Sequence, residues 1–409
     1  MNEVTELRFA LDTFYLLMSG VLVMWMAAGF SMLEAGLVRA KNTTEILTKN
    51  VALYAIACVM YLACGYGLMY TDNTAGGWLP SFASGFGNTA ADATHAAAAD
   101  FFFQVVFVAT AMSIVSGAVA ERMKLSSFLC FAVVLTGVIY PVEGYWTWGG
   151  GFLNAAGFVD FAGSGIVHLA GAAAALAGVI LLGPRQGKYF RDGTVAAIPG
   201  ANMPLAALGT LILWMGWFGF NGGSQLRLSD AENASAIALV FVNTNAAAAA
   251  GAIAALLLTQ WRFKKIDLTM LLNGALAGLV AITASPATPE PWLASSIGAV
   301  AGLLVVVSII VLDKAKIDDP VGALSVHGSA GLFGLLVVPL STTEASFGTQ
   351  LFGAAVIFGW VFGASLLLWW LLRRIRGIRV SAETEYLGAD AVECGIAAYP
   401  EFTASGPRN

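Results

Sequence analysis

Long apolar runs recur along the whole 409-residue chain, and they constrain its fold more than any other feature of the sequence. A helix of about 20 apolar residues is long enough to cross the hydrocarbon core of a bilayer. Only 11% of the residues are charged and 58% are hydrophobic, whereas ordinary soluble domains carry about 25% charged residues. A soluble helical enzyme needs more charge to cover its surface. The sequence therefore predicts an all-α polytopic membrane protein.

Eleven apolar segments predict eleven transmembrane helices. They lie at about 11–37, 50–70, 100–119, 125–142, 163–183, 204–222, 231–260, 268–285, 292–312, 321–340 and 348–372. The N-terminal sequence lacks the basic region and cleavage site of a signal peptide, so the first run is expected to be the first span. Residues 1–380 are thus predicted to form the membrane domain, and residues 381–409 a cytoplasmic C-terminal tail.

Basic residues gather in the loops that follow the odd-numbered segments. Of the 20 Lys and Arg residues, 18 lie in these loops or after the last segment, and the other two are Arg8 and Arg227. Loops rich in Lys and Arg stay on the cytoplasmic side of a membrane. The sequence therefore predicts an N-terminus outside the cell and a C-terminus in the cytoplasm.

Two of the three histidines lie in matching frames of Asp, seven residues and His. The first is DFAGSGIVHLAGA, with Asp160 and His168, and the second is DPVGALSVHGSAG, with Asp319 and His327. Their segments enter the membrane from opposite sides, as expected of an inverted repeat. The interpretation is two inverted five-helix repeats, at about 11–183 and 204–340, plus a C-terminal helix at about 348–372. Eight helical residues span about 12 Å, so both histidines are expected near the bilayer midplane.

Histidines at this depth favour a functional role. A lone buried histidine can equally well make a structural hydrogen bond, but two in repeat-related positions indicate a shared site. His168 and His327 as neutral imidazoles can pass a hydrogen bond or a proton between them. No Cys, Glu or third His stands at ligand spacing, so neither a metal nor another cofactor is expected. The cysteines, for which no disulfide framework is inferred, are Cys58, Cys64, Cys130 and Cys394.

Four acidic residues in this apolar chain are interpreted mainly as structural. Asp160 and Asp319 are expected to cap helix N-termini rather than to contact substrate, because a carboxylate there accepts from free N–H groups. Asp160 lies on the outer side, where its charge would also favour an approaching cation. Glu34 and Glu121 are interpreted as ion-pair or helix-end residues.

Aromatic residues gather near the predicted outer face. Phe103 and Phe107 come from FFFQVVF, Trp148 from EGYWTWGGG, and Phe220 and Ser224 from GWFGFNGGS. An interfacial aromatic belt is the alternative interpretation, but a belt accounts for neither the serine nor the glycine-rich run. Aromatic faces and one hydroxyl suit a small cation, which is attracted to π-systems.

These stretches together resemble the ammonium transporter family (Amt/Mep/Rh), and specifically its bacterial Amt branch. The resemblance covers nearly the whole chain. The matching stretches are GFSMLEAGLVRAKN, FFFQVVF, AERMK, DFAGSGIVHLAGA, GWFGFNGGS, DDPVGALSVHG and EYLGADAVECGIAAYPEF. The tail departs from the family pattern at Cys394, where a histidine is common.

The resemblance implies a site for each group of candidate residues. An outer ammonium-recruitment site is matched by Phe107, Trp148, Phe220 and Ser224, and a pair of gating aromatics by Phe103 and Phe107. The paired pore histidines that relay a proton are matched by His168 and His327. Asp160 matches a carboxylate that supports the outer site. It further implies a homotrimer in the inner (plasma) membrane that transports ammonium, ammonia and methylammonium. A PII-type signalling protein is the expected cytoplasmic partner, and no nucleic acid is expected.

Two other functions compete with transport. An ammonium sensor of the same fold would bind the ion and conduct little. Only Ser381–Asn409 follows the basic run, which is too short for a kinase or cyclase output domain and favours a transporter. A hydrolase using Ser224 and a histidine is the weaker alternative, because no base stands at helical spacing to this serine. The protein is therefore expected not to be an enzyme.

Overall fold

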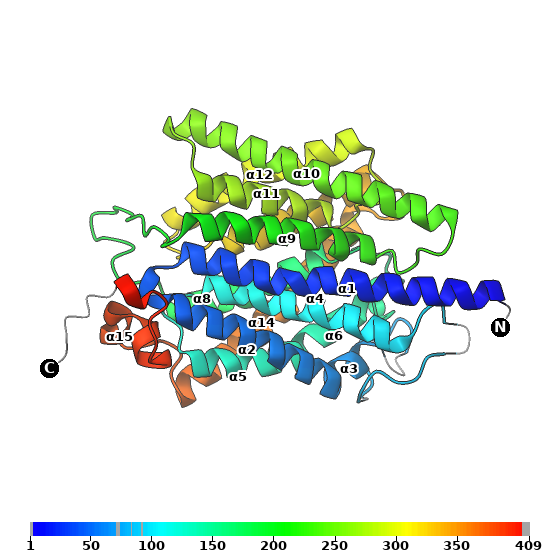
Figure 1. Cartoon of the computed structure of the whole chain (residues 1–409), viewed down its shortest axis with the longest axis horizontal. Coiled ribbons are helices and arrows are strands. Elements are labelled where there is room, and N and C mark those ends of the chain that lie inside the picture. The colour runs from blue at the N-terminus through cyan, green and yellow to red at the C-terminus, as the bar shows by residue number, and fades with distance from the viewer. Residues whose placement is uncertain (1–2, 71–73, 83, 91–92, 403–409) are drawn as a thin grey trace.

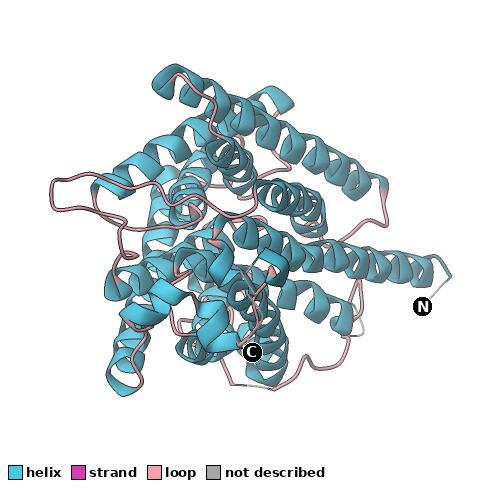
Figure 2. Cartoon of the chain, turned by 60° about the vertical axis from the view of Figure 1, so that its left-hand side comes forward, coloured by secondary structure: helices cyan, strands magenta, loops and turns pink. Residues whose placement is uncertain are grey.

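The structure is a computed structural model that describes residues 3–70, 74–82, 84–90 and 93–402. Within these residues it is helical and contains no strand, as Figure 2 shows. The long helices lie side by side along the longest axis of the molecule, with the two chain ends at opposite ends of this axis (Figure 1). The expectation of an all-α architecture is confirmed.

The first part of the chain, through residue 182, forms the helices that precede a long loop. They are α1 (Glu3–Leu37), η1 (Ala40–Asn42), α2 (Thr43–Met60), η2 (Tyr61–Gly65), α3 (Tyr66–Tyr70), α4 (Ala97–Ala118), α5 (Leu125–Val134), η3 (Leu135–Ile139), α6 (Tyr140–Thr147), α7 (Phe152–Ala155), η4 (Ser164–Leu169) and α8 (Ala170–Leu182).

The rest of the chain begins a second set of helices at residue 203. They are α9 (Met203–Gly223), α10 (Ala231–Phe263), α11 (Leu268–Ile282), α12 (Pro291–Lys314), η5 (Leu324–Ser329), α13 (Ala330–Val337), η6 (Val338–Leu340), α14 (Phe347–Ile375), α15 (Ala382–Leu387), η7 (Asp390–Cys394) and η8 (Pro400–Phe402).

Every one of the eleven predicted segments coincides with a helical stretch. Among the described residues, nine stretches are long and apolar enough to cross a membrane, and Leu268–Ile282 and Leu324–Leu340 are shorter apolar helices. The chain is therefore a multi-pass membrane protein. The number of eleven crossings and the division into repeats at about 11–183 and 204–340 stay predictions.

Glycines allow α1 and α9 to pack closely along their length (Figure 1). A Cβ on Gly36 would lie 2.4 Å from the backbone nitrogen of Ala206, and one on Gly209 would lie 2.3 Å from that of Leu33. No side chain fits at either position, so small residues set the distance between these two helices. Each of them begins one of the two predicted repeats.

The two predicted capping aspartates do cap helices. The Asp160 carboxylate accepts hydrogen bonds from the backbone N–H groups of residues 163–166 at 2.8–3.2 Å. The Asp319 carboxylate accepts from the N–H groups of Ala323 and Leu324 at 2.9 and 2.7 Å. Each cap is followed by a π-helical stretch, and η4 carries His168 while η5 carries His327. Such stretches are frequent at functional sites.

The C-terminal tail packs on the loops at the end of the molecule where the C-terminus lies (Figure 1). The Glu385 carboxylate accepts from the backbone N–H of Gln186 and from Arg379. The Asp390 carboxylate accepts from the N–H of Glu45 at 2.9 Å, and the Glu393 carboxylate from that of Leu125 at 3.0 Å. The described part of the tail thus docks on these loops, whereas residues 403–409 of the predicted tail lie outside the described residues.

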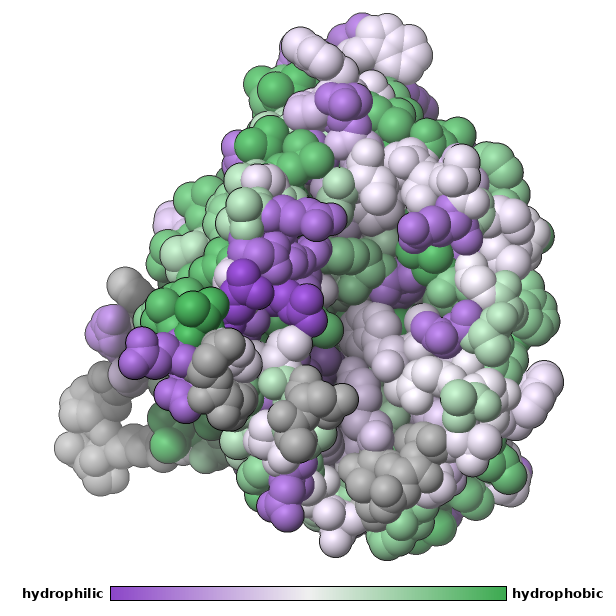
Figure 3. All heavy atoms as spheres, turned by 90° about the vertical axis from the view of Figure 1, so that its right-hand side faces the viewer, coloured by the Kyte–Doolittle hydropathy of each residue, from purple (hydrophilic) through white to green (hydrophobic). Residues whose placement is uncertain are grey.

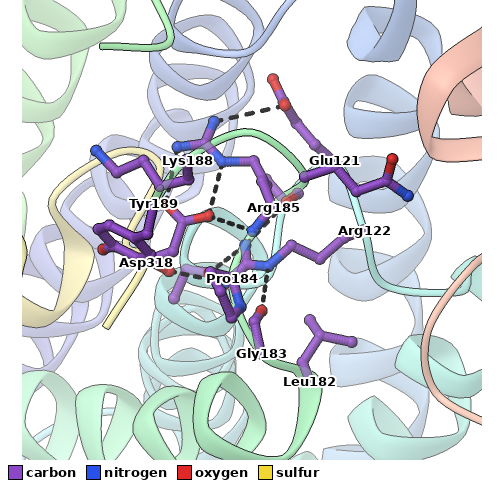
Figure 4. Close-up of polar contacts among 12 residues, drawn as sticks. Glu121, Arg122, Leu182, Gly183, Pro184, Arg185, Lys188, Tyr189 and Asp318 are labelled. Carbon is purple, nitrogen blue, oxygen red and sulfur yellow. Dashed lines mark hydrogen bonds and ion pairs between the residues drawn. The ribbon is translucent and has the colours of Figure 1, made fainter. Parts of the chain in front are cut away.

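A buried ion-pair network joins the loops at this same end (Figure 4). Arg185 donates to both carboxylate oxygens of Asp318 at 2.9 Å, and its Nη1 lies 3.5 Å from Glu121 Oε2. Glu121 also accepts from Arg39 Nε at 2.7 Å, which confirms its interpretation as an ion-pair residue. Arg122 donates to backbone carbonyls of Gly183 and Asp318. The network therefore links the loops after α1, α4, α8 and α12.

Replacing Asp318 by alanine should destabilise the protein strongly. Burial raises the pKa of this carboxyl, but hydrogen bonds and charge from Arg185 and Arg122 lower it to about 2. The ionised Asp318 carboxylate therefore stabilises the folded protein fully above the usual pKa of an aspartate. This contribution is lost only as the pH falls through about 2. Removing one partner of a buried pair costs about 3–5 kcal/mol, which thermal unfolding in detergent can measure. Asp313→Ala is the control, because its pair with Lys188 is partly exposed. If Asp318→Ala and Asp313→Ala lowered the stability by equally small amounts, the role of Asp318 as a stabilising buried partner of Arg185 would be contradicted.

Candidate functional site

A cavity of about 410 Å³ opens at the end of the molecule where α4 begins and α9 ends. Figure 3 views this end of the molecule and shows a hollow near its middle. Phe103, Phe107, Trp148, Asp160 and Ser224, all predicted site residues, line the cavity. The structure therefore brings together segments that lie more than a hundred residues apart in the sequence.

Trp148 and Ser224 form the walls of this cavity. The indole Nε1 of Trp148 donates to the backbone carbonyl of Asp160 at 2.8 Å, which fixes the orientation of the ring. Ser224 Oγ donates to the carbonyl of Phe220 at 2.8 Å, so its oxygen lone pairs are left to accept from a ligand. Because this hydroxyl bonds to the backbone of its own helix, the geometry gives no support to the hydrolase alternative.

Two phenylalanines close the bottom of the cavity. The rings of Phe107 and Phe220 are stacked with centroids 4.0 Å apart, and both side chains are buried. Phe103 meets the edge of Phe107 at 4.8 Å, and Trp148 meets it at 5.9 Å. The structure thus places Phe220 one layer deeper than Trp148 and Ser224, where it completes an apolar barrier with Phe107.

His168 and His327 lie directly beyond this barrier. Their Nδ1 atoms are 3.1 Å apart, and the ring planes are inclined by 22°. One Nδ1 must carry a proton and the other must not, so the two neutral rings have opposite tautomers. His168 also stacks at 5.5 Å on Phe220. The predicted meeting of the two histidines is present.

Two further cavities continue from the histidines toward the end of the molecule where the tail lies. The first, of about 20 Å³, is lined by His327 and by Phe30, Glu34 and Asn273 among others. The second is about 390 Å³ and shares Asn273, Val321 and Gly322 with the first. The cavity of about 410 Å³ beside Trp148 is called the outer cavity and that of about 390 Å³ the inner cavity, after the predicted orientation of the chain. The order along the molecule is thus outer cavity, aromatic barrier, histidine pair, small cavity and inner cavity.

Two buried residues were not predicted as site residues: Trp217, which lies beside the histidine pair, and Glu143, which lines none of the three cavities. Trp217 stacks on His168 with centroids 5.1 Å apart, and its indole N–H donates to Thr283 Oγ1 at 2.8 Å. Its place in GWFGFNGGS, three residues before Phe220, was the available signal. Glu143 in α6 is fully buried, and neither of its carboxylate oxygens has a hydrogen-bond partner in the described part of the chain. An acidic residue directly after a predicted apolar segment was the signal there.

Comparisons with known proteins agree with this arrangement. The sequence profile described as Ammonium Transporter Family matches residues 14–399. The chain is 42% identical to the ammonium transporter Amt2 of Archaeoglobus fulgidus, covering 96% of this chain and 89% of that one. It is 39% identical to the ammonium transporter Amt2 of Haloferax mediterranei, covering 93% and 88%.

Solved structures show the same fold. One titled Sensor Amt Protein has a TM-score of 0.90 and 35% identity, covering 95% of this chain and 99% of that one. Candida albicans Mep2 has a TM-score of 0.84 and 25% identity, covering 98% and 93%. From its profile match, its relatives and its fold, the chain is a member of the ammonium transporter family.

Proposed function

We propose that the protein is an ammonium channel or transporter whose pore is the path from the outer to the inner cavity. Ammonium is recruited beside Trp148 and Ser224 and loses its proton there. Ammonia passes the Phe107–Phe220 barrier, and the proton crosses separately through His168 and His327. The single observation that carries this proposal is the line of cavities, which in the described part of the chain is divided by two stacked rings and by two hydrogen-bonded imidazoles.

The apolar barrier favours a neutral species. An ion that leaves water for an apolar environment without partners pays a large desolvation penalty. Ammonia carries no net charge and is about as small as water, so it can pass a gap that opens when a ring rotates. If the proton follows through the histidines, each cycle moves one positive charge, and transport is electrogenic.

The setting of this pore follows from the family. We propose an inner-membrane protein with its N-terminus outside and its C-terminus in the cytoplasm, which the basic loops at the tail end of the molecule support. We further propose a homotrimer and a PII-type signalling protein as regulator, for which the packed tail offers a cytoplasmic surface. Methylammonium is expected to be a second substrate, because its ammonium head can make the same contacts.

Ammonium and methylammonium should produce currents, whereas Na⁺ and K⁺ should not. Trp148→Leu should raise the half-saturating ammonium concentration about two- to thirtyfold, because a cation–π contact contributes about 0.5–2 kcal/mol. Current recordings on purified protein in a solid-supported bilayer measure both effects. Trp292→Leu is a matched control, since Trp292 is exposed and lines none of the three pore cavities. Equal currents for K⁺ and ammonium would rule out this mechanism.

An ammonium sensor is the second candidate, favoured by the likeness to the structure titled Sensor Amt Protein. A sensor binds ammonium and conducts little. Ammonium-dependent thermal stabilisation without any current or uptake in the same preparation would favour it over transport.

A further inference from the structure

Glu34 is a buried carboxylate in the pore-side face of α1 with one oxygen unused. Its side chain is 1% exposed. Oε2 accepts from Ser116 Oγ at 2.6 Å and from Asn50 Nδ2 at 3.1 Å. Oε1 has no hydrogen-bond partner among the described residues. The carboxylate is therefore held firmly through Oε2, whereas Oε1 is buried without a partner in the described part of the chain.

Glu34 was interpreted as an ion-pair or helix-end residue, and of these two alternatives its place in the last turn of α1 agrees with the second. In the described part of the chain no cationic group lies within ion-pair distance of it; the nearby Lys49 instead donates to the Ser116 carbonyl and lies 3.8 Å from Glu45. Buried polar atoms normally have a partner, because an unpaired one costs about 1–3 kcal/mol. An ionisable group at this depth without a pair favours a functional role.

Glu34 lines the small cavity below the histidines, and this cavity has the size of one small molecule. Its volume of about 20 Å³ exceeds the roughly 10–15 Å³ that a water molecule needs. Ammonia is of similar size. His327 lines the same cavity, and since its Nδ1 is engaged with His168, its Nε2 is the ring nitrogen left for a molecule held there.

We propose that Glu34 is the proton acceptor and donor of the inner half of the pore, and that the small cavity is a site where ammonia is protonated. This inference rests on the proposed transport function and deepens it. A proton that leaves the histidine pair binds Oε1 of the carboxylate. The resulting carboxylic acid gives this proton to ammonia in the cavity, which forms ammonium and regenerates the carboxylate. Proton, nitrogen and charge all balance over one cycle.

The exit from this site is suited to the product. The small cavity shares Asn273, Val321 and Gly322 with the inner cavity of about 390 Å³. That cavity is wider, and charged side chains of both signs line it, Asp267, Asp313 and Asp319 together with Arg185 and Lys188. An ammonium ion formed at Glu34 moves toward this wider, polar space, whereas the apolar barrier opposes its return.

Glu34→Gln is the decisive variant, because glutamine keeps the size and the hydrogen-bonding capacity but cannot carry the proton. In proteoliposomes, ammonium pulses should give a current about 100-fold smaller than that of the original protein, the usual effect of losing a positioned acid–base group. Electroneutral entry of ammonia should continue, and a dye inside the vesicles should report alkalinisation. Glu34→Asp keeps the carboxyl and should recover part of the current.

Glu45→Gln is the matched control, since Glu45 is equally buried but lines none of the three pore cavities. An unchanged current in Glu34→Gln would overturn the inference, as would an Asp variant no better than Gln. Loss of both current and alkalinisation in a monodisperse Gln protein would assign Glu34 a structural role instead. If the original protein gives neither signal, the proposed transport function itself fails.

Discussion

Replacing both His168 and His327 by alanine should reduce the ammonium-dependent current about 100-fold, since the positioned acid–base pair is lost. The 3.1 Å contact between their Nδ1 atoms provides the only imidazole pair in the described chain. Without it, no titratable ring links the aromatic barrier to the small cavity. Selectivity should fall at the same time, because the space vacated by two rings can hold water, and water lets a hydrated K⁺ ion pass.

The alanine variant is expected to fold. The neighbouring surfaces are rich in Gly and Ala, and Trp217 keeps its own hydrogen bond to Thr283 when the ring of His168 is removed. Replacing either histidine by Asp or Glu should retain a cation path while discrimination is lost. His95→Ala is the control, since His95 lies in the loop before α4. A double alanine variant with normal, ammonium-specific current would contradict the role of the pair.

The sequence was sufficient for features that depend on local spacing. An apolar run and a polar flank mark a membrane helix, and an aspartate before a run of free N–H groups marks a cap. Both capping aspartates and the meeting of His168 with His327 followed from the paired frames. Helix ends were less predictable: α1 begins at Glu3, well before the apolar run at about 11, because helical hydrogen bonds continue into polar flanks.

Features that depend on the distance between helices could not be read from the sequence. The Phe107–Phe220 stack joins α4 to α9, whose separation depends on close packing such as that of the Phe103 ring on Gly223. Oε1 of Glu34 is without a partner in the described chain because both Ser116 and Asn50 donate to Oε2. The Phe107–Phe220 barrier and the site at Glu34 both depend on how helices pack against one another. The spacing of residues along a single sequence does not predict such packing.

Asp160→Ala should abolish transport and lower stability. The substitution leaves four backbone N–H groups, those of residues 163–166, without their acceptor. Each unpaired buried donor costs about 1–3 kcal/mol, less where water from the cavity replaces the carboxylate. These donors form the start of η4, which carries His168, and the adjoining carbonyl holds the Trp148 indole. One substitution therefore displaces both the recruitment site and the histidine pair.

Asp160→Asn separates the two roles of this carboxylate. Asparagine keeps one acceptor oxygen and can hold two of the four N–H groups, so the fold should be largely retained while the negative charge beside the outer cavity is lost. Thermal unfolding should then show a smaller loss for Asn than for Ala, with current reduced in both. Asp230→Ala removes a comparable but exposed cap on α10 and should change neither property strongly. An Asp160→Ala protein with unaltered current would show that the cap does not position the pore, because transport would then survive the loss of all four hydrogen bonds.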